Sequence, residues 1–144
     1  MRKLCAIIPA RGGSVGVPKK NISLVNGHPL IAYSIVACKM CPNIDRIIVS
    51  TDDEEIASIA TKYGAEVPFI RPAEFATSTS RDVEFLKHFF EQIAVDDVVL
   101  IRPTTPLRDP QVMEKAIEIY LDNKQHISSL RSLNKIPYLQ ARHP

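Results

Sequence analysis

Glycines and cations gather in one short segment of the chain, directly after an apolar run that we expect to form a buried strand. Glycine lets successive backbone N–H groups point into one concavity, and it lets a phosphate approach the chain closely. Cationic side chains neutralise a polyphosphate, so that a nucleophile can reach phosphorus. The residues concerned are Gly12, Gly13, Gly16, Arg11, Lys19 and Lys20. Residues 10–21 are therefore a candidate phosphate-binding loop.

Two well-known phosphate-binding patterns do not fit this loop. Gly-Lys-Ser/Thr never follows the glycines, which excludes a Walker A loop, and the glycine spacing differs from that of the dinucleotide-binding fingerprint. A flexible glycine turn with solvated lysines explains the same residues about equally well. Glycine content and charge alone leave both interpretations open.

Apolar runs alternate with helix-period segments along the chain. We expect strands at 3–9, 46–50 and 98–101, a weaker one at 67–70, and a further candidate at 127–130. Helical periodicity predicts helices at 29–40, 53–63, 81–93 and 110–121, the last with Asp109 as N-cap and Pro110 at its first position.

Strand–helix alternation predicts an α/β domain with a mostly parallel sheet, right-handed crossovers and helices on both faces. With 144 residues, the chain has room for one such domain. Ligands of these sheets bind beyond the carboxyl ends of the strands. The segments to examine are therefore 10–21, 51–53, 71–82 and 102–108.

The composition excludes several classes of protein. A net charge of +2 gives no basic stripe of the kind that nucleic-acid binding needs, and no apolar run approaches the roughly 20 residues of a membrane span. The apolar run at the start is cut short by Pro9 and Arg11, unlike a signal peptide. We expect a cytoplasmic protein without nucleic-acid or membrane partners.

The cysteines and histidines give weak signals. Cys38 and Cys41 form a C-x-x-C pair, which a redox or zinc site would use, yet no second pair completes four zinc ligands. We favour two small, semi-buried residues at a helix end. The four histidines occur in no recognised catalytic setting, and we expect His88 on an exposed helix face.

The full string of the loop, Ile-Pro-Ala-Arg-Gly-Gly-Ser-Val-Gly-Val-Pro-Lys-Lys-Asn, resembles the N-terminal signature of the acylneuraminate cytidylyltransferases. These enzymes make CMP-sugars from CTP and 3-deoxy-2-ulosonic acids. The resemblance continues in order through residues 26–31, 46–53, 64–74 and 102–108, and covers nearly the whole chain. It implies a three-layer Rossmann-like (GT-A-like) nucleotidyltransferase fold.

The resemblance implies that the loop wraps the phosphates of CTP. The family's nucleotide-contacting Arg, Lys and Asn map to Arg11, Lys20 and Asn21, and the first two are the candidate catalytic residues. The loop positions Gly12, Gly13 and Ser14 are implied nucleotide contacts. On residue type alone, Asn21 equally suits an N-cap or a turn.

The cytidine-facing segment of the family corresponds to residues 76–80. It reads the base largely through backbone groups, which implies nucleotide contacts at Ser78 and Ser80. Here the sequence departs from the common Asp-Thr-Ala-Ser-Ser, with Ser78 in place of the acid. Taken alone, the serines suit an N-cap for the following helix.

Two aspartates end the expected second strand. Asp52 and Asp53 suit the positioning of a metal or nucleotide, or the capping of the next helix. We favour capping for at least one of them.

The strand-end motif at 102–108 faces the sugar acid in the family. It implies substrate contacts by Arg102, Thr104, Thr105 and Arg108. Arg102 replaces the family's usual Gln, and we expect it to pair with a carboxylate of the acceptor. Read without the resemblance, Arg102 is a surface residue and the prolines around it are turn-formers.

Two departures limit what the resemblance implies. Val15 occupies the position of a usual Lys. The family's metal-binding aspartates and its dimerisation segment lie beyond residue 144, so the C-terminal part of the family fold is missing, and we expect residues 1–144 to be a truncated nucleotide-binding domain. Metal ligands in the chain are unknown, and the resemblance implies Mg²⁺ held mainly from outside it, with homodimerisation of a full-length protein.

The sequence thus predicts an enzyme that transfers CMP from CTP to a sialic-acid-like sugar and releases pyrophosphate. Its partners are then CTP and a small acidic sugar. Two alternatives stay open: a nucleotide-binding module or truncated relative without catalysis of its own, and a Kdo-type cytidylyltransferase.

Overall fold

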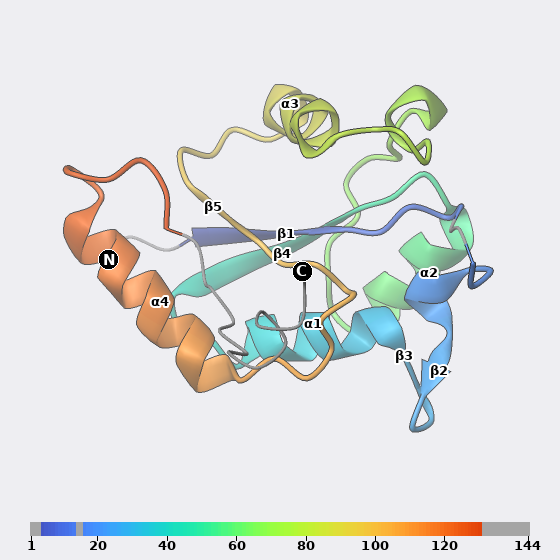
Figure 1. The fold of residues 1–144 in the computed structure, drawn as a ribbon, viewed down its shortest axis with the longest axis horizontal. Coiled ribbons are helices and arrows are strands. Elements are labelled where there is room, and N and C mark those ends of the chain that lie inside the picture. Colours follow the sequence, from blue (N-terminus) through green and yellow to red (C-terminus); the bar gives the residue numbers. More distant parts are fainter. Residues whose placement is uncertain (1–3, 14–15, 131–144) are drawn as a thin grey trace, which may run out of the picture.

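A computed structural model describes residues 4–13 and 16–130 of the chain. Its main sheet has three parallel strands, β1 (Leu4–Pro9), β4 (Ile44–Ser50) and β5 (Val98–Leu100), in the order β4-β1-β5. β1 pairs along its whole length with β4 and through Cys5, Ala6 and Ile7 with β5. The carboxyl ends of the three strands therefore meet at one edge of the sheet (Figure 1).

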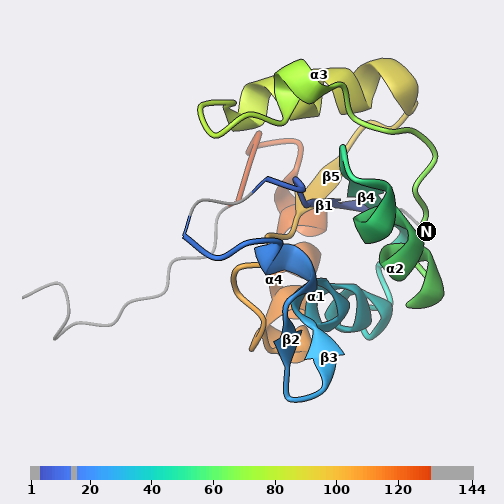
Figure 2. The same ribbon diagram turned by 90° about the vertical axis from the view of Figure 1, so that its right-hand side faces the viewer.

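Helices cover both faces of this sheet, which gives the three-layer α/β fold that the sequence predicts (Figures 1 and 2). Alternate side chains of a strand point to opposite faces. Ala6 and Ile8 of β1 pack in one core with α1 (Leu30–Lys39), α2 (Glu54–Lys62) and α4 (Pro110–Asn123). Cys5 and Ile7 pack on the other face, against α3 (Asp82–Gln92).

The helices begin and end where their sequence signals lie. The Asp53 side chain accepts from the N–H groups of Glu55 and Ile56 and so caps α2, which confirms the capping role for one of the two aspartates. Asp109 caps α4 by accepting from the Gln111 N–H, with Pro110 at the first position. Gly64, with a φ of 94°, follows the end of α2.

Three expectations about local structure are wrong. Residues 67–70 form no strand, and their neighbour Glu66 makes one isolated parallel bridge with Ile48. Residues 127–130 form no strand either. His88 is 8% exposed, because it lies between the rings of Phe69 and Phe75 at the buried side of α3.

The structure contains a small β-hairpin that the sequence did not predict. β2 (Leu24–Val25) and β3 (His28–Pro29) pair through a turn at Asn26 and Gly27, both with positive φ. Two-residue turns of Asn-Gly are typical of this geometry. The strands are too short for an alternating pattern to reveal them.

Cys38 and Cys41 are free thiols in the core, 0% and 1% exposed. The structure thus makes them more deeply buried than the semi-buried residues we expected. No group of three His, Cys, Asp or Glu side chains in the described residues could hold a metal ion. Within the same part of the chain, no helix is long and apolar enough to cross a membrane.

Candidate nucleotide-binding pocket

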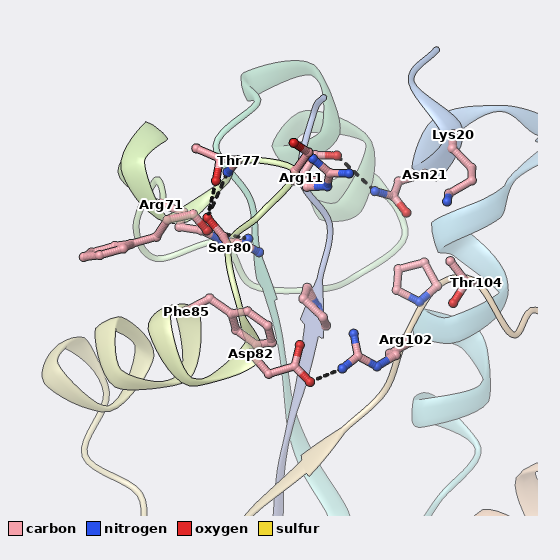
Figure 3. A pocket seen from close by; sticks show the side chains of 14 residues that line it. Arg11, Lys20, Asn21, Arg71, Thr77, Ser80, Asp82, Phe85, Arg102 and Thr104 are labelled. Atoms are coloured by element: carbon pink, nitrogen blue, oxygen red, sulfur yellow. Dashed lines mark hydrogen bonds and ion pairs between the residues drawn. The ribbon is translucent and has the colours of Figure 1, made fainter. Parts of the chain in front are cut away.

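A pocket lies at the carboxyl ends of β1 and β5, where parallel α/β sheets bind ligands (Figure 3). Four segments line it: the end of β1 with the glycine-rich loop, the loop before α3, the first turn of α3, and the segment after β5. The lining residues are Pro9, Arg11, Lys20, Asn21, Arg71, Phe75, Thr77, Ser78, Ser80, Asp82, Phe85, Arg102, Pro103 and Thr104. Four of these described residues are cationic and one is a carboxylate, so the pocket suits an anion.

The glycine-rich loop brings Arg11 and Lys20 to the same hollow (Figure 3). Lys20 belongs to a short 3-10 helix, η1 (Lys20–Ile22), that follows the loop. Asn21 is 7% exposed, and its side-chain amide donates to the Arg11 carbonyl over 3.0 Å. This bond joins the two ends of the loop and holds Arg11 beside Lys20.

The start of the glycine-rich loop is held by the residues that follow β4. The Gly12 N–H donates to Asp52 Oδ1 over 2.8 Å. A Cβ at Gly12 would lie 2.7 Å from Asp53 Oδ2, so only glycine fits against this aspartate without a shift. Gly13 has open space around it, and Ser14, a predicted contact, lies outside the described residues. Neither Gly12 nor Gly13 lines the pocket.

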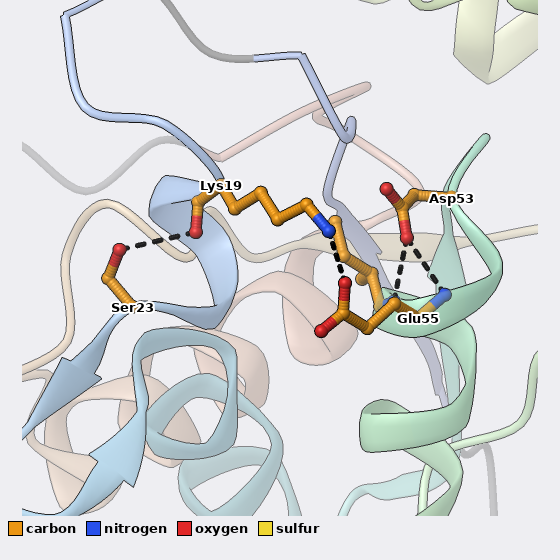
Figure 4. A network of polar contacts seen from close by, with 5 residues as sticks. Lys19, Ser23, Asp53 and Glu55 are labelled. Carbon is orange, nitrogen blue, oxygen red and sulfur yellow. Dashed lines mark hydrogen bonds and ion pairs between the residues drawn. The ribbon is translucent and has the colours of Figure 1, made fainter.

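Lys19 points away from the pocket, although it precedes Lys20 directly. It forms an ion pair with Glu55 in the first turn of α2, and its carbonyl accepts from the Ser23 hydroxyl over 3.2 Å (Figure 4). Its φ of 48° turns the backbone between the two lysines. The bond to Glu55 raises the pKa of Lys19, so Lys19 remains a cation that ties the loop to α2.

Arg71 is a buried cation that the sequence analysis did not single out. It is 4% exposed, and its guanidinium donates to Ser50 Oγ over 3.0 Å, to the Ser50 carbonyl over 2.6 Å and to the Phe75 carbonyl over 3.3 Å. It lies 5.0 Å from the centre of the Phe85 ring. Burial lowers the pKa of Arg71 to about 10, so it stays charged at neutral pH.

Arg71 connects the end of β4 to the loop before α3. Its backbone N–H also donates to the Thr51 carbonyl over 2.7 Å. The Arg-Pro-Ala-Glu string was part of the family resemblance, but nothing in its pattern showed that the arginine is buried. The signal that could have found it is an arginine directly before proline at the end of an apolar run.

The serine-rich loop lines the pocket at Thr77, Ser78 and Ser80. The Ser80 hydroxyl accepts from the Thr77 N–H over 3.0 Å, which closes a tight turn. The serines do not cap α3, because the Arg81 N–H donates instead to the Glu84 side chain over 2.7 Å. Ser78 and Ser80 therefore line the pocket, and their contacts to a nucleotide stay a prediction.

The segment after β5 carries four predicted substrate contacts, of which two line the pocket. Arg102 and Thr104 line the pocket, whereas Thr105 and Arg108 do not. Arg108 donates to the Arg102 carbonyl over 3.1 Å, and burial lowers the pKa of Arg108. The Arg102 side chain forms an ion pair with Asp82, the first residue of α3 (Figure 3).

The fold and this pocket define a three-layer α/β domain with a cation-lined pocket at the carboxyl ends of its strands. The sequence identifies it further, because the cytidylyltransferase family model matches residues 5–137. The chain belongs to this family.

Curated relatives agree with the family. CMP-N,N'-diacetyllegionaminic acid synthase of Legionella pneumophila is 39% identical over 94% of this chain and 60% of its own length. N-acylneuraminate cytidylyltransferase of Escherichia coli is 37% identical over 92% of the chain and 32% of its length. Pseudaminic acid cytidylyltransferase of Campylobacter jejuni is 40% identical over 86% of this chain and 55% of its own length. The chain spans about a third to three fifths of the length of these relatives.

Solved structures confirm the fold. CMP:2-keto-3-deoxy-manno-octonic acid synthetase complexed with CTP superposes with a TM-score of 0.75 at 19% identity, over 85% of this chain and 48% of that one. A cytidylyltransferase from Leptospira borgpetersenii gives 0.68 at 20% identity, over 88% and 52%. The resemblance seen in the sequence and the Rossmann-like fold it implied are both confirmed.

Proposed function

We propose that this protein transfers CMP from CTP to a sialic-acid-like 3-deoxy-2-ulosonic acid and releases pyrophosphate. The observation that carries the proposal is the meeting of Arg11, Lys20, Arg71 and Arg102 around one pocket at the carboxyl ends of the strands. The names of the relatives, which are cytidylyltransferases or CMP-sugar synthases for acylneuraminate, legionaminic acid and pseudaminic acid, support a cytidylyl donor and a sialic-acid-like acceptor.

In the proposed reaction, the anomeric hydroxyl oxygen of the sugar attacks the α-phosphorus of CTP in line. A bond forms between this oxygen and phosphorus, the bond to the β-phosphate oxygen breaks, and the hydroxyl proton passes to solvent. Arg11 forms bidentate hydrogen bonds to phosphate oxygens, and Lys20 adds a point charge. Both stabilise the negative charge that builds up on the leaving pyrophosphate.

The two sides of the pocket receive different parts of the substrates. Ser78 and Ser80 lie where cytidine binds in the proposal, and Phe75 lines the same pocket. Arg102 and Thr104 lie on the acceptor side and bind the sugar acid. Thr105 and Arg108 lie outside the lining residues, and their predicted contacts to sugar are not part of the proposal for this pocket.

The described residues do not form a resident site for Mg²⁺. Asp82 is the one carboxylate among the described lining residues, and it is ion-paired with Arg102. Asp52 Oδ1 accepts from Gly12, and Asp53 caps α2. Mg²⁺ prefers several oxygen ligands in octahedral geometry, and the described lining residues do not supply such a set. The homodimer and the cytoplasmic location stay predictions.

Calorimetry with CTP, UTP, ATP and GTP tests the nucleotide half of the proposal. We expect measurable binding of CTP and at least tenfold weaker binding of the other three. Equal binding of all four nucleotides would contradict the assignment to cytidine.

Pyrophosphate release tests the transfer half. We expect release when CTP is combined with N-acetylneuraminic acid, and less with 3-deoxy-manno-octulosonic acid. CTP binding without any release, with either sugar, would instead support a nucleotide-binding module. Faster release with 3-deoxy-manno-octulosonic acid would support the Kdo-type alternative.

A further inference from the structure

Asp82 and Arg102 face each other across the pocket from different elements. Arg102 follows β5, and Asp82 begins α3, twenty positions earlier in the chain (Figure 3). Their side chains are 49% and 47% exposed. Both residues line the pocket, so a ligand that fills it meets this ion pair.

The backbone of Arg102 is fixed, while its side chain reaches into the pocket. The Ile101 N–H donates to the Ile7 carbonyl over 3.0 Å, and the Arg102 carbonyl accepts from Arg108 over 3.1 Å. The ion pair is half exposed, and exposed pairs of this kind contribute about 0 to 1 kcal/mol. The guanidinium can therefore exchange one carboxylate for another at little cost.

Asp82 has no second structural role among the bonds of the described residues. The cap of α3 is made by Glu84, which accepts from the Arg81 N–H. Arg71, another guanidinium that lines the pocket, is bound by Ser50 and Phe75. The one carboxylate among the described lining residues is thus placed on the one arginine that lies on the acceptor side.

From this arrangement, and resting on the proposed function, we propose that Asp82 is a specificity-determining residue that occupies Arg102 as a stand-in for the substrate's carboxylate. An acidic sugar replaces Asp82 on Arg102, so the guanidinium keeps a carboxylate partner. A neutral sugar would have to displace Asp82 without offering a replacement charge. The ion pair therefore favours the binding of acids over neutral analogues. The Asp82 carboxylate also competes with the acid for Arg102, which weakens the binding of the acid.

The test is the binding of N-acetylneuraminic acid and its methyl ester, measured by calorimetry, to the protein loaded with the α,β-methylene analogue of CTP, which cannot release pyrophosphate. Asp82→Asn removes the competing charge, so we expect the acid to bind about threefold more tightly. We also expect the preference of this variant for the acid over the ester to be smaller than the loss of one negative charge would by itself produce. Arg102→Gln should weaken acid binding about tenfold and leave ester binding within twofold. In the double variant, Asp82→Asn should no longer improve acid binding.

Glu91→Gln is the matched control, because Glu91 lies exposed on the same helix, outside the pocket. It removes one negative charge and should leave acid binding within 1.5-fold. Thermal unfolding of each variant checks that the fold is retained. If Asp82→Asn fails to fold, Asp82→Ser takes its place.

Three results would overturn the inference: weaker acid binding in Asp82→Asn, an unchanged affinity, or an equal gain in Glu91→Gln. The same titrations begin with CTP alone. A wild-type protein that does not bind CTP contradicts the proposed function, whereas one that binds CTP and the acid but ignores Asp82 contradicts this inference alone.

Discussion

At the scale of single residues, the sequence shows which cationic residues follow the strands, but it does not show where each of their side chains points. Arg11, Lys20 and Arg102 were predicted from the motifs and all line the pocket. By residue type Lys19 and Lys20 are alike, and only the family resemblance singles out Lys20. The positive φ at Lys19 turns the backbone between them, so that Lys19 pairs with Glu55 and Lys20 lines the pocket. Burial of Arg71 and His88 was missed, because it depends on packing between segments distant in sequence.

The difference between Gly12 and Gly13 gives a prediction at this scale. A methyl group at Gly12 would lie 2.7 Å from Asp53 Oδ2, while one at Gly13 meets nothing within 4 Å. Gly12→Ala must therefore displace the loop or the start of α2. We expect at least tenfold weaker CTP binding in Gly12→Ala, and a change of less than threefold in Gly13→Ala, both measured by calorimetry. Equal effects would show that the contact with Asp53 does not shape the loop.

The three thiols give a second prediction. Burial raises the pKa of Cys38 from 9.0 to about 12, and those of Cys5 and Cys41 to about 11. Since the thiolate is the reactive form, we expect no reaction with Ellman's reagent at pH 8 in the folded protein, and three reactive thiols in denaturant. Fast reaction of the native protein would contradict this burial.

The same shifts fix a pH dependence. The folded-state pKa values lie above the unfolded ones, so the stability that the protonated thiols provide is complete below pH 9 and is lost as the pH rises toward 11 to 12. Urea unfolding at pH 8 and pH 10 measures this loss. Replacing Cys38 by Ala should reduce the difference between the two pH values.

At the scale of elements, the boundaries of the long periodic helices and of the β-branched strands agree with the prediction within two residues. The failures share a cause. Residues 67–70 are a short apolar run, and residues 127–130 are apolar only at their two ends, so neither carries a clear strand period. A strand also needs a neighbour to pair with, and beside the first segment the sheet pairs with Glu66 alone. The two-residue strands of the hairpin carry no period at all.

The N-cap of α2 gives the prediction at this scale. Asp53 accepts from two N–H groups at the start of the helix. Asp53→Ala should lower the free energy of unfolding by about 1 kcal/mol, measured by urea denaturation, whereas Asp53→Asn keeps an acceptor and should cost only a few tenths. CTP affinity in Asp53→Asn should stay within twofold. A large loss of CTP binding would assign Asp53 to the nucleotide instead of the helix.

At the scale of the whole molecule, strand–helix alternation was enough to predict the layers and the edge of the sheet where ligands bind. The order of the strands and the ion pair between Arg102 and Asp82 were not predictable, because both depend on how α3 is placed over the sheet. Gly12 and Gly13 do not line the pocket, and Gly12 holds the loop against Asp52 and Asp53. Their contacts to a nucleotide stay a prediction.

In the proposed function, the glycine-rich loop presents Arg11 and Lys20, and not Lys19, to the phosphates of CTP. The most direct test compares the dissociation constant of CTP for Lys20→Met and Lys19→Met, two neighbouring substitutions that remove the same charge. We predict that Lys20→Met raises it at least tenfold, and that Lys19→Met, which loses only the exposed pair with Glu55, changes it less than threefold. Equal effects of the two substitutions, or a larger effect at Lys19, would contradict the account.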